Sequence, residues 1–377
     1  MTGKTDALHL ILNKKIVSGV LDWYQQNHRD LPWRRDRDPY HIWISEIMLQ
    51  QTRVAAVLDY YLRFLRELPD LWALAGVSED RLMKLWEGLG YYNRARNLKK
   101  AAGVILDRFG GSFPETEEEL LSLPGIGAYT AGAIGSICFG LPLPAVDGNV
   151  LRVISRIMAD PSPIQQERTR AGVQQELRLV YQTLEKSKRS TLTQSLMELG
   201  ATVCIPKGEP GCAGCPLNRI CASHKEGTEQ DYPVKLKQAA RRKEEKTVFI
   251  LISEGEGEIR TAIRRRPDTG LLSGLYEFPN LPGSRSLKQV LEHMENWDTG
   301  NAVPMMELPY THIFSHVEWH MKGFLLKTDK CPEELSGIGR VQWVSLQKLQ
   351  EDNALPSAFK PFLQLLQKTE FHENHQR

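Results

Sequence analysis

Four cysteines lie close together in the chain, and no other feature constrains the fold as strongly. Cys204, Cys212, Cys215 and Cys221 have the spacing C-x7-C-x2-C-x5-C. The N-terminal residues lack the pattern of a signal peptide, and no apolar run approaches the roughly 18 residues that span a bilayer. We therefore expect a cytoplasmic protein with no membrane partner, in which cysteines stay reduced. Clustered reduced cysteines indicate a metal centre rather than disulfides.

The spacing of these cysteines favours one kind of metal centre. Common zinc modules pair two knuckles of Cys or His across a longer insert. Here all four thiols fall in one compact loop, which favours a four-cysteine iron–sulfur cluster, with structural zinc as the alternative. Cys138 and Cys331 stand apart, and we expect both to be small buried hydrophobic residues.

The length and the local patterns predict two domains joined by a linker. A chain of 377 residues is too long for one ordinary core. Residues 1–222 have helical periodicity, residues 223–246 are polar without an apolar face, and residues 247–370 have strand-like patterns before a final apolar helix. We expect a helical region, an interdomain linker and an α+β domain. The net charge of +2 does not by itself indicate a polyanionic partner.

Helical periodicity is clear in residues 38–68. Asp38 is a candidate N-cap, and Pro39 then takes the first helical position. Apolar residues recur at helical spacing from Ile44 to Leu65, across the polar residues 50–53. This pattern predicts that helix continues throughout the stretch.

The stretch "LPGIGAYTAG", residues 123–132, predicts a tight glycine turn that leads into a helix of small residues. Gly125 and Gly127 would allow backbone amides and the positive end of the helix dipole to face a phosphate. A short glycine turn between helices is also an ordinary connection, so this feature leaves both interpretations open.

Two carboxylates stand in unlike surroundings. Glu46 lies among apolar residues in "WISEIMLQQ", where desolvation would raise its pKa and keep it a proton donor. Asp147 lies in "LPLPAVDGNV", a loop that precedes a helix. One protonated and one ionised carboxylate together can cleave a glycosidic bond. The alternatives are a glutamate at a solvated helix edge and an aspartate that is only an N-cap.

Aromatic and basic residues mix in two short stretches. "DLPWRRDRDPY" contains Trp33 and Arg34, and "GLGYYNRAR" contains Tyr91 and Tyr92. Stacking rings beside cations are typical of DNA-binding grooves. The other interpretation is core aromatic residues with solvated charges nearby.

Together these motifs resemble the helix-hairpin-helix DNA glycosylase superfamily, and more closely the adenine DNA glycosylases of the MutY family. The resemblance covers nearly the whole chain. It implies a multidomain fold: an all-α helix-hairpin-helix catalytic region with one [4Fe-4S] cluster loop, and an α+β Nudix-like C-terminal domain. It also implies a monomeric base-excision repair enzyme of the bacterial cytoplasm, associated with the nucleoid. Its partner would be double-stranded DNA in which adenine is mispaired with 8-oxoguanine or guanine.

The resemblance assigns roles within the helical region. Glu46 matches the general acid, Asp147 matches the carboxylate that stabilises the oxocarbenium ion, and Asn149 is placed to hydrogen-bond near it. Gly125 and Gly127 belong to the hairpin that grips a phosphate. Further positions match DNA and substrate contacts: Leu31, Trp33, Arg34 and Val54 the adenine pocket, Gln51 and Tyr91 the residues that fill or wedge the base stack, and Thr52, Leu89 and Gly90 the neighbours of 8-oxoguanine.

The resemblance also assigns a role to the C-terminal domain. In "HIFSH", Phe314, Ser315 and His316 match the loop that reads 8-oxoguanine. "GLYEFPN" resembles the strand before a Nudix catalytic helix, but "SLKQVLEHM" lacks the Arg-Glu and Glu-Glu pairs that hold magnesium. We therefore interpret this part as a recognition domain and not as a pyrophosphatase.

Two departures bear on the choice between related enzymes. The usual cluster spacing has six residues between the first two cysteines, whereas "CIPKGEPGC" has seven, an insertion that a loop tolerates. An endonuclease III-like pyrimidine glycosylase and lyase needs a lysine nucleophile just after the hairpin, where this chain has Tyr129. This predicts base removal without strand cleavage. A nucleotide-pool hydrolase and a silent mismatch-binding module are the alternatives from other classes.

Overall fold

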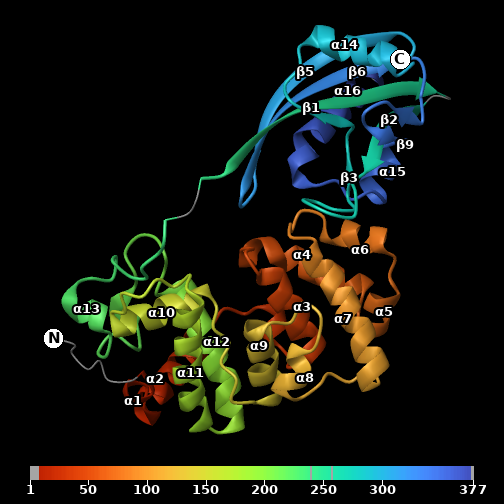
Figure 1. Cartoon of the computed structure of the whole chain (residues 1–377). Helices are drawn as coiled ribbons and strands as arrows, with labels where there is room; N and C mark the ends of the chain where they lie inside the picture. The colour runs from red at the N-terminus through yellow and green to blue at the C-terminus, as the bar shows by residue number, and fades with distance from the viewer. Residues whose placement is uncertain (1–7, 238–239, 256–257, 375–377) are drawn as a thin grey trace. The chain divides into compact units, whose positions relative to one another are not determined.

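The computed structural model describes residues 8–237, 240–255 and 258–374. The described residues divide into two compact units (Figure 1). The first unit contains those of Met1–Gly76 and Arg96–Lys237, and the second contains those of Val77–Ala95 and Gln238–Arg377. Among the helices of the described residues, none is long and apolar enough to cross a membrane.

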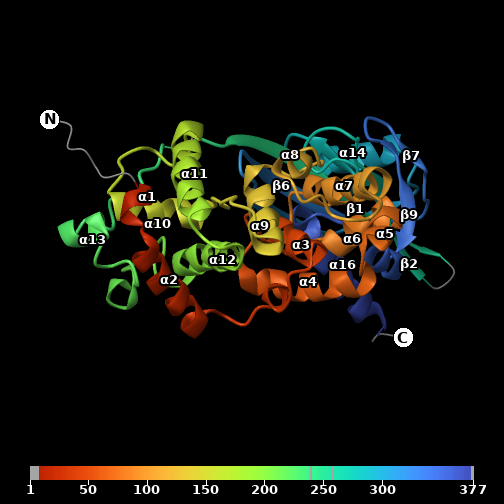
Figure 2. The same ribbon diagram turned by 90° about the horizontal axis from the view of Figure 1, so that it is seen from below.

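The described part of the first unit is built from helices and turns, as its periodicity predicts. Its helices are α1 (Leu8–Ile11), α2 (Lys14–Asn27), η1 (Pro32–Arg34), α3 (Pro39–Leu49), α4 (Val54–Glu67), α5 (Leu71–Gly76), most of α7 (Asn93–Phe109), α8 (Glu117–Leu121), α9 (Ala128–Phe139), α10 (Gly148–Met158), α11 (Glu167–Gln182), α12 (Lys186–Thr202), η2 (Cys212–Gly214) and α13 (Ala222–Glu226). Helix α9 packs against both α3 and α12, between which it lies in Figure 2.

The start of α3 confirms the predicted cap, but the predicted continuous helix is wrong. The Asp38 side chain accepts a hydrogen bond from the Tyr40 amide, and Pro39 is the first helical residue. The helix then ends at Leu49, and α4 begins only at Val54. Gln51 between them has a φ of 59°, a left-handed conformation that a right-handed helix cannot contain. Neither Gly nor Pro marks this bend, so periodicity alone could not show it.

A glycine of the "LPGIGAYTAG" stretch brings the loop before α10 close to α9. A Cβ atom on Gly132 would lie 2.5 Å from the carbonyl oxygen of Pro144. Only glycine therefore allows the backbone of residues 144–147 to pack directly on α9. Asp147 follows at the end of this loop, as the N-cap of α10.

The second unit contains a mixed sheet and several helices. Its strands are β1 (Arg242–Gly255), β2 (Glu258–Arg265), β3 (Tyr276–Glu277), β4 (Asn280–Pro282), β5 (Ala302–Ile313), β6 (Val317–Thr328), β7 (Glu334–Leu335), β8 (Gly339–Arg340) and β9 (Gln342–Ser345). Its helices are α6 (Glu79–Trp86), α14 (Leu287–Asn296), α15 (Leu346–Glu351), η3 (Ser357–Phe359) and α16 (Lys360–Asn374). The main sheet has the order β3-β2-β1-β6-β5, with β4 paired to β1 and β9 paired to β2.

The strand alternation buries both faces of this sheet. Along β1, Val248 and Ile250 face a core that includes Phe362 of α16, whereas Phe249 and Leu251 face a core that includes Val290 of α14. Helices therefore cover the sheet on two sides, which gives an α+β unit of three layers. Strands β1 and β6 are parallel, and β5 and β6 form an antiparallel hairpin. The stretch "THIFSHVEWHMKGFLL" thus contains the end of one strand, a tight turn and a second strand.

The predicted linker, residues 223–246, contains both docked and strand-forming segments. Arg156 of α10 donates hydrogen bonds from Nε to the carbonyls of Glu229 (2.8 Å) and Tyr232 (3.0 Å). The amide of Ile164 bonds to the carbonyl of Val234 at 3.1 Å. Strand β1 begins at Arg242, inside the same stretch. A polar composition therefore did not prevent this segment from making specific backbone contacts.

Candidate active site

The helical unit contains a cavity of about 490 Å³. Ten residues singled out from the sequence line it: Leu31, Trp33, Arg34, Glu46, Gln51, Thr52, Val54, Tyr129, Asp147 and Asn149. Small-molecule sites have volumes of roughly 300–1,000 Å³. The cavity is therefore large enough to receive a nucleobase with its sugar.

Glu46 lies in the wall of this cavity with a raised proton affinity. Its helix α3 is apolar on nearly every side, and the residue is only 6% exposed. Burial raises the pKa of Glu46 to about 7, helped by the negative charge of Asp147 and opposed by a hydrogen bond from Tyr129. The Tyr129 hydroxyl, at the start of α9, donates to Glu46 Oε2. A carboxyl group with this pKa can deliver a proton near neutral pH.

Asp147 caps α10 and is held in one orientation. Its Oδ1 accepts a hydrogen bond from the Val150 amide, and its Oδ2 accepts one from the side-chain amide of Asn149, both at 2.8 Å. Burial raises the pKa of Asp147, and these two hydrogen bonds oppose that effect because they stabilise the ionised form. The cap is real, yet the carboxylate also faces the cavity, so the two interpretations of Asp147 are compatible.

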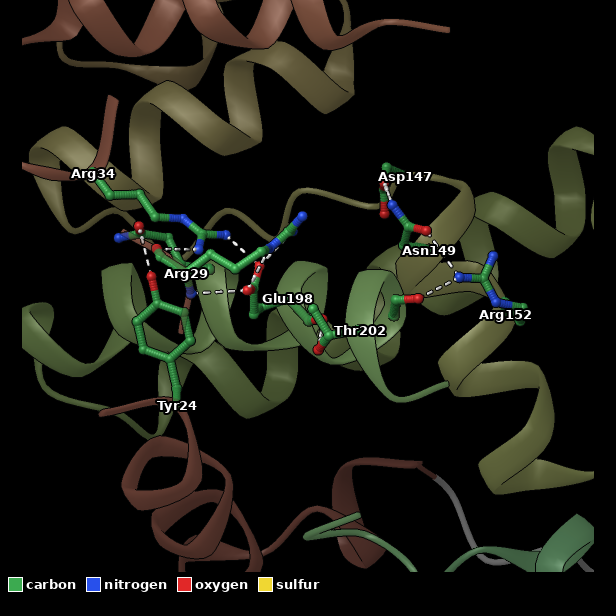
Figure 3. Close-up of polar contacts among 10 residues, drawn as sticks. Tyr24, Arg29, Arg34, Asp147, Asn149, Arg152, Glu198 and Thr202 are labelled. Carbon is green, nitrogen blue, oxygen red and sulfur yellow. Dashed lines mark hydrogen bonds and ion pairs between the residues drawn. The ribbon is translucent and has the colours of Figure 1, made fainter. Parts of the chain in front are cut away.

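Asn149 is itself oriented by an arginine (Figure 3). Arg152 Nη2 donates to Asn149 Oδ1 at 2.8 Å and to the carbonyl of Gly200 at 2.6 Å. Arg152 Nε donates to the carbonyl of Cys204 at 2.7 Å. A Cβ atom on Gly200 would lie 2.6 Å from Asn149 Cβ, so glycine is needed there. A chain of hydrogen bonds therefore runs from Asp147 to the first clustered cysteine.

The structure reveals a second buried glutamate that the sequence reasoning missed. Glu198 of α12 is fully buried and lines the cavity. It accepts hydrogen bonds from Arg29 Nε (2.8 Å) and Nη2 (2.7 Å), and from Arg34 Nη2 (2.8 Å), as Figure 3 shows. Burial alone would raise its pKa, but the two arginines hold the pKa of Glu198 at about 2. The apolar run "SLMELG" around it resembles the setting of Glu46 and could have revealed it.

Two residues predicted to enter the base stack share an unusual backbone conformation. Gln51 has a φ of 59° and Tyr91 a φ of 48°. Non-glycine residues adopt this left-handed region at an energetic cost, and they persist there mainly at functional sites. Gln51 lines the cavity of the first unit. Tyr91 lies in the second unit, after α6, together with Leu89 and Gly90, and its side chain is 48% exposed.

The glycine hairpin lies between α8 and α9. Gly125 has a φ of 77°, and a Cβ atom there would lie 2.6 Å from Asn97 Cβ, so both conformation and space require glycine. Gly127 is the N-cap of α9 and makes no side-chain cap. The first amides of α9 and the positive end of its dipole therefore have no capping side chain at this position. That arrangement suits an anion such as a phosphate.

The second unit presents Phe314, Ser315 and His316 at the tip of the β5–β6 hairpin. Ser315 and His316 are exposed, whereas Phe314 is partly buried against Trp319. The Ser315 hydroxyl lies 2.6 Å from the Tyr91 hydroxyl. Two of the sequence-predicted positions are thus brought into contact although 224 residues separate them.

The four clustered cysteines line one cavity next to α10 and α12. All four are free thiols, and burial raises the pKa of Cys215 to about 12. A buried thiolate needs a cation nearby, so four convergent thiols form a donor set that fits a metal cluster. The two separate cysteines differ: Cys138 is partly buried, but Cys331 is exposed. The prediction of a buried Cys331 is wrong because it lies in the turn after β6.

Comparisons with known proteins agree with this organisation. Residues 44–178 match the model of the HhH-GPD superfamily of base excision DNA repair proteins, and residues 247–365 match the NUDIX domain. These matches confirm the predicted helical helix-hairpin-helix region and Nudix-like α+β domain.

Similar proteins come from distant organisms. An adenine DNA glycosylase of Mus musculus is 34% identical over 88% of this chain and 74% of its own length. One of Buchnera aphidicola subsp. Acyrthosiphon pisum is 30% identical over 93% of this chain and 97% of its own length. A thermostable thymine-DNA glycosylase structure is 28% identical, with a TM-score of 0.50, over 59% of this chain and all of that one. The chain therefore belongs to the adenine DNA glycosylases, base-excision repair enzymes that cleave N-glycosidic bonds in DNA.

Proposed function

We propose that this enzyme removes adenine mispaired with 8-oxoguanine or guanine in double-stranded DNA. The observation that carries this proposal is the meeting of Glu46, Tyr129 and Asp147 in one cavity lined by Trp33 and Arg34. A base inside a duplex cannot reach such a cavity, so adenine must first be flipped out of the stack. Gln51 would fill the space left in the duplex, and Tyr91 would wedge into the base stack.

Glu46 and Asp147 then divide the chemistry. The C1′–N9 bond breaks with its electron pair moving to adenine, and Glu46 delivers a proton to N7, so adenine leaves as a neutral base. The ionised Asp147 would stabilise the oxocarbenium ion that forms at the sugar, before water adds at C1′ and releases a proton. Asn149 keeps this carboxylate in position. The phosphate beside the flipped nucleotide would bind at the Gly125–Gly127 hairpin.

The enzyme would be monofunctional. The endonuclease III-like alternative forms a Schiff base between a lysine and the sugar, and it requires that lysine just after the hairpin. Tyr129 occupies this position and already donates a hydrogen bond to Glu46. Borohydride should therefore trap no covalent complex with DNA that contains the mispair. A trapped complex would favour the lyase instead.

We further propose that the cysteine loop holds one [4Fe-4S] cluster. Cys204, Cys212, Cys215 and Cys221 would be its ligands, and the bound cluster would order the loop rather than react with the substrate. The purified protein should be brown and contain iron and sulfide. A colourless protein with one zinc ion per chain would support the zinc alternative.

The decisive experiment measures base release from three duplexes. Adenine should be released from A:8-oxoguanine and from A:G duplexes, but not from an A:T duplex of the same sequence. Free adenine is detected by chromatography, and strand nicking without added alkali is measured in the same samples. Release of an oxidised pyrimidine, or nicking in step with base release, would contradict the proposal.

A further inference from the structure

We propose that Arg241 is a positioning residue for the loop Phe314–His316, and that it strengthens the preference for 8-oxoguanine over guanine. This inference rests on the proposed function, which assigns that loop to the reading of 8-oxoguanine. Arg241 is exposed and belongs to the residues that precede the first strand of the second unit. No motif in the sequence distinguishes it from the neighbouring arginine and lysine.

The strand register explains why Arg241 lies beside the loop. Strand β1 begins at Arg242 and β6 begins at Val317, and these two residues are partners in a parallel pair. Residues just before β1 therefore lie next to residues just before β6, which form the loop. The order of the sheet thus brings the end of the predicted linker to the tip of the β5–β6 hairpin.

Three hydrogen bonds hold the backbone of the loop. Arg241 Nε donates to the carbonyl of Phe314 at 3.1 Å. The Arg242 amide donates to the carbonyl of His316 at 3.2 Å, and the Phe314 amide donates to the carbonyl of Val317 at 2.8 Å. The first is a charge-assisted contact from a side chain, so a substitution can remove it while leaving the strand ladder intact.

Contacts of Phe314 hold the first residue of the turn that carries Ser315, whose hydroxyl also lies 2.6 Å from that of Tyr91. The Phe314 ring packs edge-on against Trp319, with ring centroids 4.8 Å apart, and against His312 at 4.5 Å. With its ring and its carbonyl both held, Phe314 fixes the start of the turn that carries the exposed Ser315 hydroxyl. A loop held in this way loses less conformational entropy on binding than a free loop does.

Preorganisation matters here because the two bases differ little. 8-Oxoguanine carries an oxygen at C8 and a hydrogen at N7, where guanine has a C8 hydrogen and an N7 acceptor. A recognition loop must place polar groups opposite these two atoms to tell the bases apart. A loop that can shift would adapt to both, so the contact from Arg241 favours discrimination more than it favours affinity.

The adjacent residue provides a matched control. The Arg242 side chain bonds to Glu244 Oε1 at 2.5 Å, and its contact with the loop is made by the backbone amide. The R242A variant therefore removes the same charge, one residue away, and leaves the hydrogen bond from Arg241 to Phe314 in place. The R241K variant keeps the charge at 241 but loses the planar Nε–H donor.

The test measures dissociation constants of the full chain for two duplexes. Both contain 2′-fluoro-2′-deoxyadenosine, which resists cleavage because fluorine destabilises the oxocarbenium ion, opposite either 8-oxoguanine or guanine. The readout is the dissociation constant for the guanine duplex divided by that for the 8-oxoguanine duplex. Partial unfolding lowers the active fraction equally for both duplexes and leaves this ratio unchanged. R241A and R241K should lower the ratio by roughly 5- to 10-fold, as expected for one hydrogen bond of about 1 kcal/mol. R242A should keep it.

Each other outcome has a distinct meaning. If R241A and R241K keep the wild-type ratio, or if R242A loses as much of it, the role of Arg241 is overturned and the proposed function is unaffected. If the wild-type protein binds both duplexes equally, the proposed reading of 8-oxoguanine fails, and this inference fails with it. The S315A variant, which removes the hydroxyl assigned to 8-oxoguanine recognition, shows how far the ratio falls when the loop no longer recognises this base.

Discussion

Two buried glutamates that line the cavity differ in their hydrogen-bond partners and in their pKa. Glu46 of α3 and Glu198 of α12 are both buried in helices and both line the cavity. Glu46 accepts a hydrogen bond from the neutral Tyr129, and its pKa rises to about 7. Glu198 meets two arginines, and its pKa falls to about 2.

This difference shows that burial alone does not decide the charge of a carboxyl group. Burial disfavours the ionised form of both residues, but the cations beside Glu198 outweigh it. Glu46 can therefore deliver a proton, while Glu198 carries a fixed negative charge paired with two positive ones. Substitutions to glutamine should consequently have opposite effects on stability at the two positions.

The largest effect should be the loss of turnover in E46Q. Glutamine cannot donate the proton that lets adenine leave, so single-turnover base release should fall by about 10²–10⁴-fold. Binding of the 2′-fluoro A:8-oxoguanine duplex should survive, since the shape of the cavity is retained. A rate of base release within a few-fold of the wild type would show that Glu46 is not the general acid.

The next largest effect should be the loss of stability in E198Q. Removing the carboxylate leaves two arginines without their counter-charge, and breaking such a buried pair costs about 3–5 kcal/mol. We expect about 3 kcal/mol, the lower end, because Arg29 is 38% exposed. Hydrogen exchange of α12 peptides at pH 7 measures the change in the free energy of opening.

The pH dependence of this loss tests its electrostatic cause. The folded-state pKa of Glu198, about 2, lies below the ordinary value of 4.5, so its contribution is present above pH 4.5 and is lost as the pH falls towards 2. The difference between E198Q and the wild type should therefore shrink over that range. A constant difference would indicate lost packing instead.

A smaller effect of opposite sign should appear in the stability of E46Q. The folded-state pKa of Glu46 lies above the ordinary 4.5, so the stability from its protonated form is full below pH 4.5 and is lost as the pH rises through 7. Glutamine avoids this loss, so at pH 8 E46Q should be more stable than the wild type by up to about 3 kcal/mol. At pH 4 the two proteins should differ little. Hydrogen exchange of α3 peptides measures the stability difference at both pH values. If E46Q were less stable than the wild type at pH 8, the contrast between Glu46 and Glu198 would be wrong.

The smallest effect should come from Y129F. The rate of base release by the wild type should fall above about pH 7, as Glu46 loses its proton. The hydrogen bond from Tyr129 stabilises the ionised carboxylate, and its loss should raise the pKa of Glu46 further. The alkaline limb of the single-turnover pH profile should therefore move to higher pH. A limb that stays in place would show that Tyr129 does not tune this acid.

Local sequence was sufficient to predict the burial and capping of residues whose contacts are with their neighbours in the chain. The apolar neighbours of Glu46 predicted its burial, and the loop before α10 predicted the cap at Asp147. Local sequence was insufficient where distant segments meet. The bend at Gln51 carries no glycine or proline, and Glu198 owes its charge to Arg29 and Arg34, more than 160 residues away.

The sequence by itself determined the two kinds of domain, the cysteine loop and the carboxylates, because periodicity, spacing and local polarity are properties of neighbouring residues. Only the tertiary structure decided which of these groups share a cavity and which carry charge, because these depend on contacts between distant elements. Gly132 illustrates the link: its missing side chain is visible in the sequence, but only the fold shows that the loop before Asp147 occupies that space. The position of Arg241 likewise follows from the parallel register of β1 and β6, which no local pattern contains.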